Sequence, residues 1–355
     1  MITPEPTAAA WPAKAGTSTK LTNIAELRLL FALCVVVAHS IQLGGFSQHD
    51  IWRKILSSEV AVQAFFILSG FLVMGSYARS PDVADFYYRR WLRIYPGYAM
   101  AVLFFLALCL LQAQAQGHAV SRSDVLRYLW ANLSLLNFLQ PSISGVFETS
   151  AYREINGALW TIKLEVMFYA LVPLFSACAR RWSLRHTAVV LMLVGLGWRP
   201  LLALLQQQLG WRLHPSLAHQ LPGQLHFFAL GMLLFDVSRQ PGRALGNALA
   251  ALAGVALAWT LGESRLALQM LLLLVFIHAI TQLPQARTPL SKTDLSYGVY
   301  LAHFPIVQLL VGSDVRHWSA GPFLALVLLL ALAYALLSWR WIEQPALNLA
   351  QAGKP

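Results

Sequence analysis

The chain reads FLALVLLLALAYALL from Phe323 to Leu337, without one charged residue. Comparable runs with little polar interruption recur at residues 27–38, 101–111, 188–196 and 248–261. Each run sits in a low-charge stretch near the roughly 20 residues that a membrane-spanning helix needs. The whole chain of 355 residues is 57% hydrophobic and 12% charged, whereas about a quarter of the residues of an ordinary soluble protein are charged. The sequence therefore predicts an all-α polytopic membrane protein.

The composition also excludes other classes of protein. A disordered chain lacks this many apolar residues, and a disulfide scaffold needs more than three cysteines. The net charge of +11 does not indicate a nucleic-acid partner, because a Lys/Arg excess in a membrane protein mostly records which loops face the cytoplasm. Cys34, Cys109 and Cys178 lie in apolar stretches, so we expect buried thiols without bridges.

We expect about ten transmembrane helices, near residues 24–43, 59–76, 96–114, 158–178, 187–207, 221–237, 244–262, 264–283, 294–312 and 321–340. Most of the 26 Lys and Arg then fall in cytoplasmic segments if both termini are cytoplasmic. Residues 126–139 are too short for a span and are expected to form an interfacial or re-entrant piece on the outer face. We divide the chain into a disordered cytoplasmic tail at 1–21, a membrane domain at 22–346 and a cytoplasmic tail at 347–355.

Ionisable residues inside a bilayer are costly and are functional candidates when they face the bundle interior. Eleven residues separate Arg28 from His39, which is roughly 16 Å and about three helical turns. Both side chains are therefore expected on nearly one face, with Arg28 toward the cytoplasm and His39 in the outer half. The alternatives are an Arg28 that reaches the inner headgroups and a His39 that bonds a carbonyl in a packed core.

A basic and aromatic cluster, FYYRRWLRIYP, precedes the third expected span and ends at Pro96. We expect the span to begin at this proline, because proline is favoured in a first helical turn. Arg90 and Arg93 are candidates for a polyphosphate site, since guanidinium groups bind phosphate bidentately. The alternative is the usual positive charge at a cytoplasmic membrane surface.

Two further polar residues lie at depths comparable to that of His39. Glu165 is expected roughly 10 Å into its span, where it pairs with Arg199 or orients a catalytic imidazole. His303 is expected near mid-membrane, as a second polar contact or as a core histidine. Pro305 follows it and should bend the helix and free a carbonyl.

The motifs, taken in order, resemble the acyltransferase-3 family of bacterial inner-membrane acyltransferases. They cover roughly residues 22–346 and include the Arg28–His39 spacing, FFILSGFL at 65–72, RWLRIYP at 90–96, LWTIKLE at 159–165, YLAHFP at 300–305 and IEQP at 342–345. In the second motif, Ser69-Gly70 is expected to permit close helix approach. The charge pair of Arg340 and Glu343 before Pro345 is interpreted as structural. The family includes O-antigen, exopolysaccharide and Nod-factor acetylases.

The resemblance implies a reaction and a donor. An acyl-CoA, for which we expect acetyl-CoA, would dock its phosphates at the cytoplasmic arginines Arg28, Arg90 and Arg93. His39 would act as general base on a hydroxyl of a cell-surface or exported glycan, or accept the acetyl group transiently, with Glu165 orienting its ring. The protein would then be a multi-pass enzyme of the bacterial inner membrane, and no metal is expected.

The sequence also suggests residues that contact the acceptor. We expect His303, Ser69 and Trp160 to contact the glycan or glycolipid acceptor. We expect no C-terminal SGNH hydrolase-like domain, so either the membrane domain completes transfer or a separate periplasmic protein assists. The alternative function is a transporter or flippase of a lipid-linked saccharide, because buried His, Glu and Arg also line transport pathways. Acetyl transfer by the purified protein distinguishes the two.

Overall fold

The structure is a computed structural model that describes residues 22–148, 150–286 and 293–352. Apart from turns and loops, these residues are helical, and no β-strand occurs among them. They group into two compact units that the chain enters more than once. Unit 1 contains Gln63–Phe86 and Met167–Gln285, and unit 2 contains Asn23–Val62, Tyr87–Val166 and the part from Ala286 onward.

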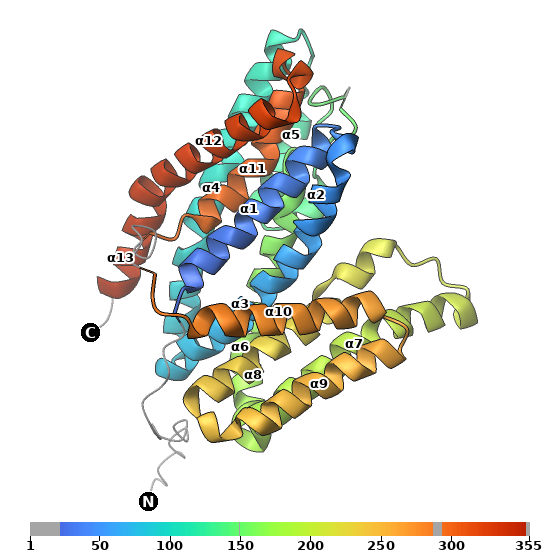
Figure 1. The fold of residues 1–355 in the computed structure, drawn as a ribbon. Helices are drawn as coiled ribbons and strands as arrows, with labels where there is room; N and C mark the ends of the chain where they lie inside the picture. Colours follow the sequence, from blue (N-terminus) through green and yellow to red (C-terminus); the bar gives the residue numbers. More distant parts are fainter. Residues whose placement is uncertain (1–21, 149, 287–292, 353–355) are drawn as a thin grey trace, which may run out of the picture. The chain divides into compact units, whose positions relative to one another are not determined.

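Unit 2 is built around α11, which packs against α1 and α12 (Figure 1). Helix α11 is buried all round from Ser296 to Gln308, as expected of a helix at the centre of a bundle. The helices that lie wholly in this unit are α1 (Ile24–Leu43), α2 (Asp50–Ile55), α5 (Arg122–Leu133), α11 (Ser296–Val311), α12 (Ala320–Ser338) and α13 (Gln344–Ala352). Three helices have residues assigned to both units: α3 (Ser58–Arg79), α4 (Val83–Ala115) and α6 (Trp160–Trp182).

Unit 1 is centred on α8, which packs against α7 and α9. Its helices are α7 (Leu184–Leu209), α8 (Leu225–Arg239), α9 (Ala244–Thr260) and α10 (Ser264–Gln282), together with the remainder of α3 and α6. Two glycines bring α3 and α8 into backbone contact. A Cβ built on Gly231 would lie 2.0 Å from the Ile67 carbonyl oxygen, and one on Gly70 would lie 2.1 Å from that of Phe228. Small residues of this kind let membrane helices approach closely.

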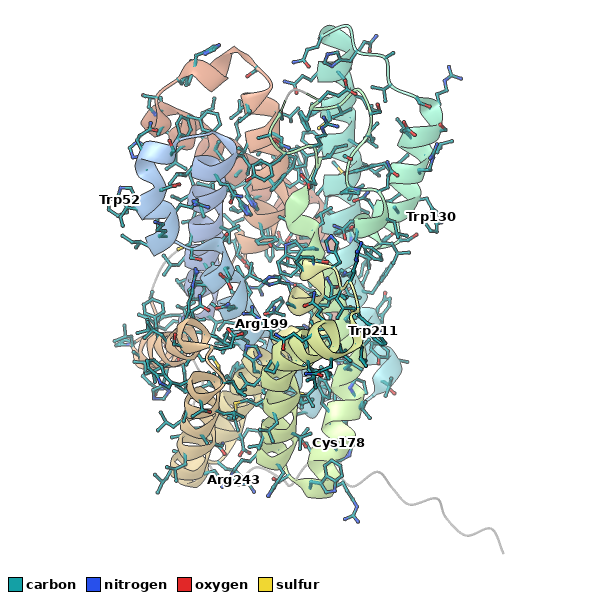
Figure 2. All side chains as sticks on the ribbon, turned by 90° about the vertical axis from the view of Figure 1, so that its right-hand side faces the viewer. Trp52, Trp130, Cys178, Arg199, Trp211 and Arg243 are labelled. Carbon is teal, nitrogen blue, oxygen red and sulfur yellow. The ribbon has the colours of Figure 1, made fainter. Side chains whose placement is uncertain are left out.

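The all-α membrane prediction is confirmed. In the described part of the chain, nine helices are long and apolar enough to cross a membrane, and the shorter α11 occupies the ninth expected span. Large apolar side chains are exposed on several helices, such as Leu111 at 62% and Leu329 at 64%, as expected where helices face lipid. Trp52 of α2 and Trp130 of α5 point outward from unit 2 (Figure 2), which is typical of residues at a membrane interface.

The expected start of the third span at Pro96 is wrong. Helix α4 begins at Val83, so Pro96 lies in its interior and the run from Arg89 to Arg93 is helical. An internal proline removes one backbone hydrogen bond and introduces a local clash, yet the helix continues through Pro96 here. The basic cluster at residues 86–96 is consequently helical throughout.

Other boundaries differ by less. Residues 126–139 form the end of α5 and a short 3₁₀ turn, Asn137–Leu139, and α5 with its 12 residues is too short to span a bilayer. The expected tail at 347–355 is helical as far as Ala352, while residues 1–21 lie outside the described part. The three cysteines are free thiols, but Cys34 and Cys178 are only partly buried.

The close approach of α3 and α8 makes a prediction for stability. Gly231→Ala should lower the midpoint of thermal unfolding in detergent, because overpacking against a backbone carbonyl costs ~1–3 kcal/mol. Gly197→Ala in α7 is the matched control, since a Cβ there meets no atom within 4 Å. Equal midpoints for the two variants would show that the α3–α8 contact is looser than described.

Candidate active site

The two histidines singled out from the sequence touch each other in unit 2. His39 on α1 and His303 on α11 face each other with Nδ1 and Nε2 2.8 Å apart. The other ring nitrogen of His303, Nδ1, lies 2.7 Å from the Tyr300 carbonyl oxygen. His303 has no exposed surface, while His39 is partly exposed. The structure thus joins the two residues in one hydrogen-bonded pair.

The two imidazole rings meet edge to edge. Their planes are inclined by 5° and their centroids are 5.1 Å apart. The facing nitrogens are 2.8 Å apart, and the centroid separation exceeds this only by the distance from each nitrogen to the centroid of its own ring. Both nitrogens therefore lie almost on the line that joins the two centroids. The hydrogen bond therefore lies close to the plane of both rings, which is the direction of the nitrogen lone pairs.

Proline fixes the local conformation of α11 at this point. Pro305 has no N–H, so the Leu301 carbonyl four residues earlier loses its intrahelical donor. Asn156 replaces that donor through its Nδ2, at 2.9 Å, and its Oδ1 accepts from the Ala158 N–H at 3.2 Å. The freed carbonyl expected from the sequence is therefore that of Leu301, and it fastens the segment before α6 to the histidine helix.

The same segment packs against Phe304 of α11, which in turn contacts His39. The Phe304 ring stands edge-on to the His39 ring, with centroids 5.6 Å apart. A Cβ built on Gly157 would lie 2.7 Å from Phe304, so only glycine fits there without displacing this ring. Tyr152 is held from two helices: its hydroxyl accepts from Gln42 of α1 at 2.7 Å and its carbonyl from Gln308 of α11 at 2.8 Å.

Glu165 does not hold the His39 ring. Among the described residues, the hydrogen-bond partner of His39 is His303. Glu165 is partly buried on α6 and interacts electrostatically with Tyr300. The hypothesis that Glu165 orients the imidazole is thus replaced by orientation through His303. The alternative partner of Glu165, Arg199 in unit 1 (labelled in Figure 2), forms its ion pair with Glu263 at 3.3 Å.

A second polar cluster joins two of the predicted donor-binding arginines. Arg28 Nη1 lies 3.1 Å from Asp294 Oδ2, and Arg93 forms an ion pair with the same oxygen. Ser296 donates to the other carboxylate oxygen. Asp294 lies just before the start of α11, and its carboxylate receives both guanidinium groups and the Ser296 hydroxyl. Asp294 is therefore an ionised bridge between Arg28 and Arg93.

Glu343 joins this cluster from the end of α12. It lies in a π-helical turn, Trp339–Glu343, and is 2% exposed. Ser338 donates to its Oε1 at 2.9 Å, and Glu343 interacts electrostatically with the arginines and Asp294. The sequence interpretation of a charge pair with Arg340 is wrong, because Arg340 is exposed and the π-helical turn directs Glu343 inward.

The remaining predicted residues are dispersed. Arg90 lies one turn before Arg93 on α4 and is partly buried, and Trp160 is the partly exposed first residue of α6. Ser69 is buried on α3, but it belongs to unit 1, whereas the other seven predicted residues belong to unit 2. Sequence reasoning assigned no role to Asp294. The feature of the sequence that could have identified Asp294 is an acidic residue at the start of an expected span, on the side of the membrane where the arginines were expected.

Comparison with known proteins gives the family. The sequence matches the family model described as Acyltransferase domain over residues 24–339. It is 28% identical to Nodulation protein 10 of Rhizobium leguminosarum bv. viciae, over 95% of this chain and 96% of that protein. It is 25% identical to the O-acetyl transferase of Shigella phage Sf6, over 89% and 93% of the two chains. No solved structure matches. The chain belongs to the acyltransferase-3 family.

Proposed function

We propose that this protein is an O-acyltransferase of the bacterial inner membrane that transfers an acetyl group from cytoplasmic acetyl-CoA to a hydroxyl of a cell-surface or exported glycan. Family membership supports acyl transfer, and one full-length relative is named an O-acetyl transferase. The observation that carries the proposal is His39, a partly exposed imidazole whose ring is fixed by a fully buried neighbour. A positioned histidine of this kind is the commonest general base.

Acetyl transfer from a thioester to a hydroxyl requires two proton transfers, one to His39 and one from it. The acceptor oxygen attacks the thioester carbonyl, and its proton passes to Nε2 of His39, the ring nitrogen that does not face His303. The new C–O bond forms, the C–S bond breaks, and the departing thiolate of CoA receives the proton from His39. In this scheme His39 is the catalytic residue, and the acyl group is the only part of the donor that crosses toward the acceptor.

The arginine cluster supports the choice of donor. Arg28 and Arg93 converge on a single carboxylate oxygen, which holds their guanidinium groups side by side. Arg28 Nε is buried with no hydrogen-bond partner among the described residues, so an incoming phosphate oxygen would satisfy it. Guanidinium groups bind phosphates in a bidentate manner, and CoA offers several phosphates. Arg90 extends the same face of α4.

Removal of the base should abolish the chemical step without abolishing donor binding. His39→Ala should bind acetyl-CoA normally but lose acetyl transfer by a factor of about 10² to 10⁴, the usual contribution of a positioned general base. His186→Ala is the control, because His186 is an exposed histidine of unit 1. Near-normal turnover of well-folded His39→Ala would exclude His39 as the base.

Donor binding should depend on the arginines of α4. Arg90→Ala should weaken acetyl-CoA binding to the purified protein about tenfold or more, because each lost charge-assisted contact is worth ~1.5–3 kcal/mol. Arg181→Ala, an exposed arginine at the end of α6, should bind as the wild type does. Calorimetric titration gives both affinities. Equal affinities for the two variants would remove Arg90 from the donor site.

The acceptor is identified in the cell. Mass spectrometry of surface glycans from a strain lacking the gene should reveal the loss of one acetyl mass from a single glycan, restored by the wild-type gene but not by the His39→Ala gene. A glycan that is missing altogether, and not merely unacetylated, would favour the transporter or flippase alternative.

A further inference from the structure

We infer that His303 is a positioning residue that selects the tautomer of His39 and so makes Nε2 the atom that accepts the proton. This inference deepens the proposed function and rests on it for its catalytic meaning. The observations that carry it are two hydrogen bonds in series, from His39 to His303 and from His303 to the Tyr300 carbonyl. Their directions follow from the chemistry of the groups involved.

The series begins at a group that can only accept. The Tyr300 carbonyl oxygen has no hydrogen, so His303 Nδ1, 2.7 Å away, carries the proton of that bond. A neutral imidazole has one N–H, and His303 Nε2 therefore presents a lone pair. The 2.8 Å contact then requires the hydrogen of His39 Nδ1. A neutral His39 is left with its lone pair on Nε2.

His303 stays neutral because of where it lies. It has no exposed surface, and the groups at its ring in the described part of the chain are His39, Tyr300, Phe304 and the Val299 backbone, none of which is a carboxylate. An isolated buried cation would be strongly unfavourable at such a position. The bond to Tyr300 is made within one turn of α11, so the local helix fixes the His303 tautomer independently of any ligand.

The same bond strengthens when His39 becomes charged. Protonation of Nε2 converts His39 to an imidazolium ion, and donation from Nδ1 to the His303 lone pair becomes a charge-assisted hydrogen bond, roughly twice as strong as a neutral one. His303 thus stabilises the charged form at the moment when the acceptor hydroxyl loses its proton. Catalytic triads use a third group to orient the base in the same way, usually a carboxylate. In this protein the neutral imidazole of His303 takes the place of that carboxylate.

Two substitutions separate hydrogen bonding from packing. His303→Gln can place an amide oxygen near the position of Nε2 and accept from His39, whereas His303→Leu fills similar space without an acceptor. His303→Leu should lower kcat about 10- to 100-fold while leaving the KM for acetyl-CoA unchanged. His303→Gln should recover most of the lost kcat. Thermal unfolding midpoints identify any variant that fails to fold. Equal kcat for folded His303→Leu and wild type, or equal loss in both variants, would overturn the inference.

A spectroscopic measurement tests the tautomer without activity. In protein labelled with ¹⁵N-histidine, the signals of His39 are assigned by comparison with His39→Gln. Wild type and His303→Gln should show His39 protonated at Nδ1 and unprotonated at Nε2. His303→Leu should show a mixture of the two tautomers of His39. A wild-type His39 protonated at Nε2 would refute the inference even if the protein is an active acyltransferase. A correct tautomer with an active His39→Ala would instead refute the proposed base and leave the hydrogen-bond assignment intact.

Discussion

A polar group buried in an apolar helix bundle has lost its water and must find its partner within the chain, and this constraint organises unit 2. The buried polar side chains of α11 find such partners along the whole length of the helix. The Tyr297 hydroxyl donates to the Ile94 carbonyl of α4 at 2.8 Å, and His303 bonds the ring of His39 on α1. Gln308 donates to the carbonyls of Tyr152 and Glu154 before α6, at 2.8 and 2.9 Å. Each bond ties α11 to a different neighbour.

These ties explain why the paired histidines and the arginine pair belong to one framework. Asp294, which bridges Arg28 and Arg93, lies directly before α11, and His303 lies about two and a half turns further along. Arg28 and His39 likewise lie on one helix, α1. The two helices pack side by side, so each supplies one member of both polar clusters (Figure 1). A shift of either helix would disturb both clusters together.

Hydropathy and spacing predicted the helical spans and the shared face of Arg28 and His39, because both properties are set within a single helix. They could not predict which helices become neighbours. Depth matching therefore paired His39 with Glu165, whereas the rotation and packing of α11 paired it with His303. Pro96 was misread for a related reason, since a local preference for the first turn of a helix yielded to the continuity of α4. Asp294 gained importance only from partners distant in sequence.

Pro305 gives this framework an evolutionary signature. Because proline leaves the Leu301 carbonyl without its helical donor, Asn156 must supply one from another segment of the chain. Any lineage that replaces the proline restores the donor within the helix, and residue 156 then needs only an acceptor for the Ala158 N–H. Positions 156 and 305 should therefore covary among family members, with asparagine retained where proline is present and aspartate, serine or threonine also accepted where it is not.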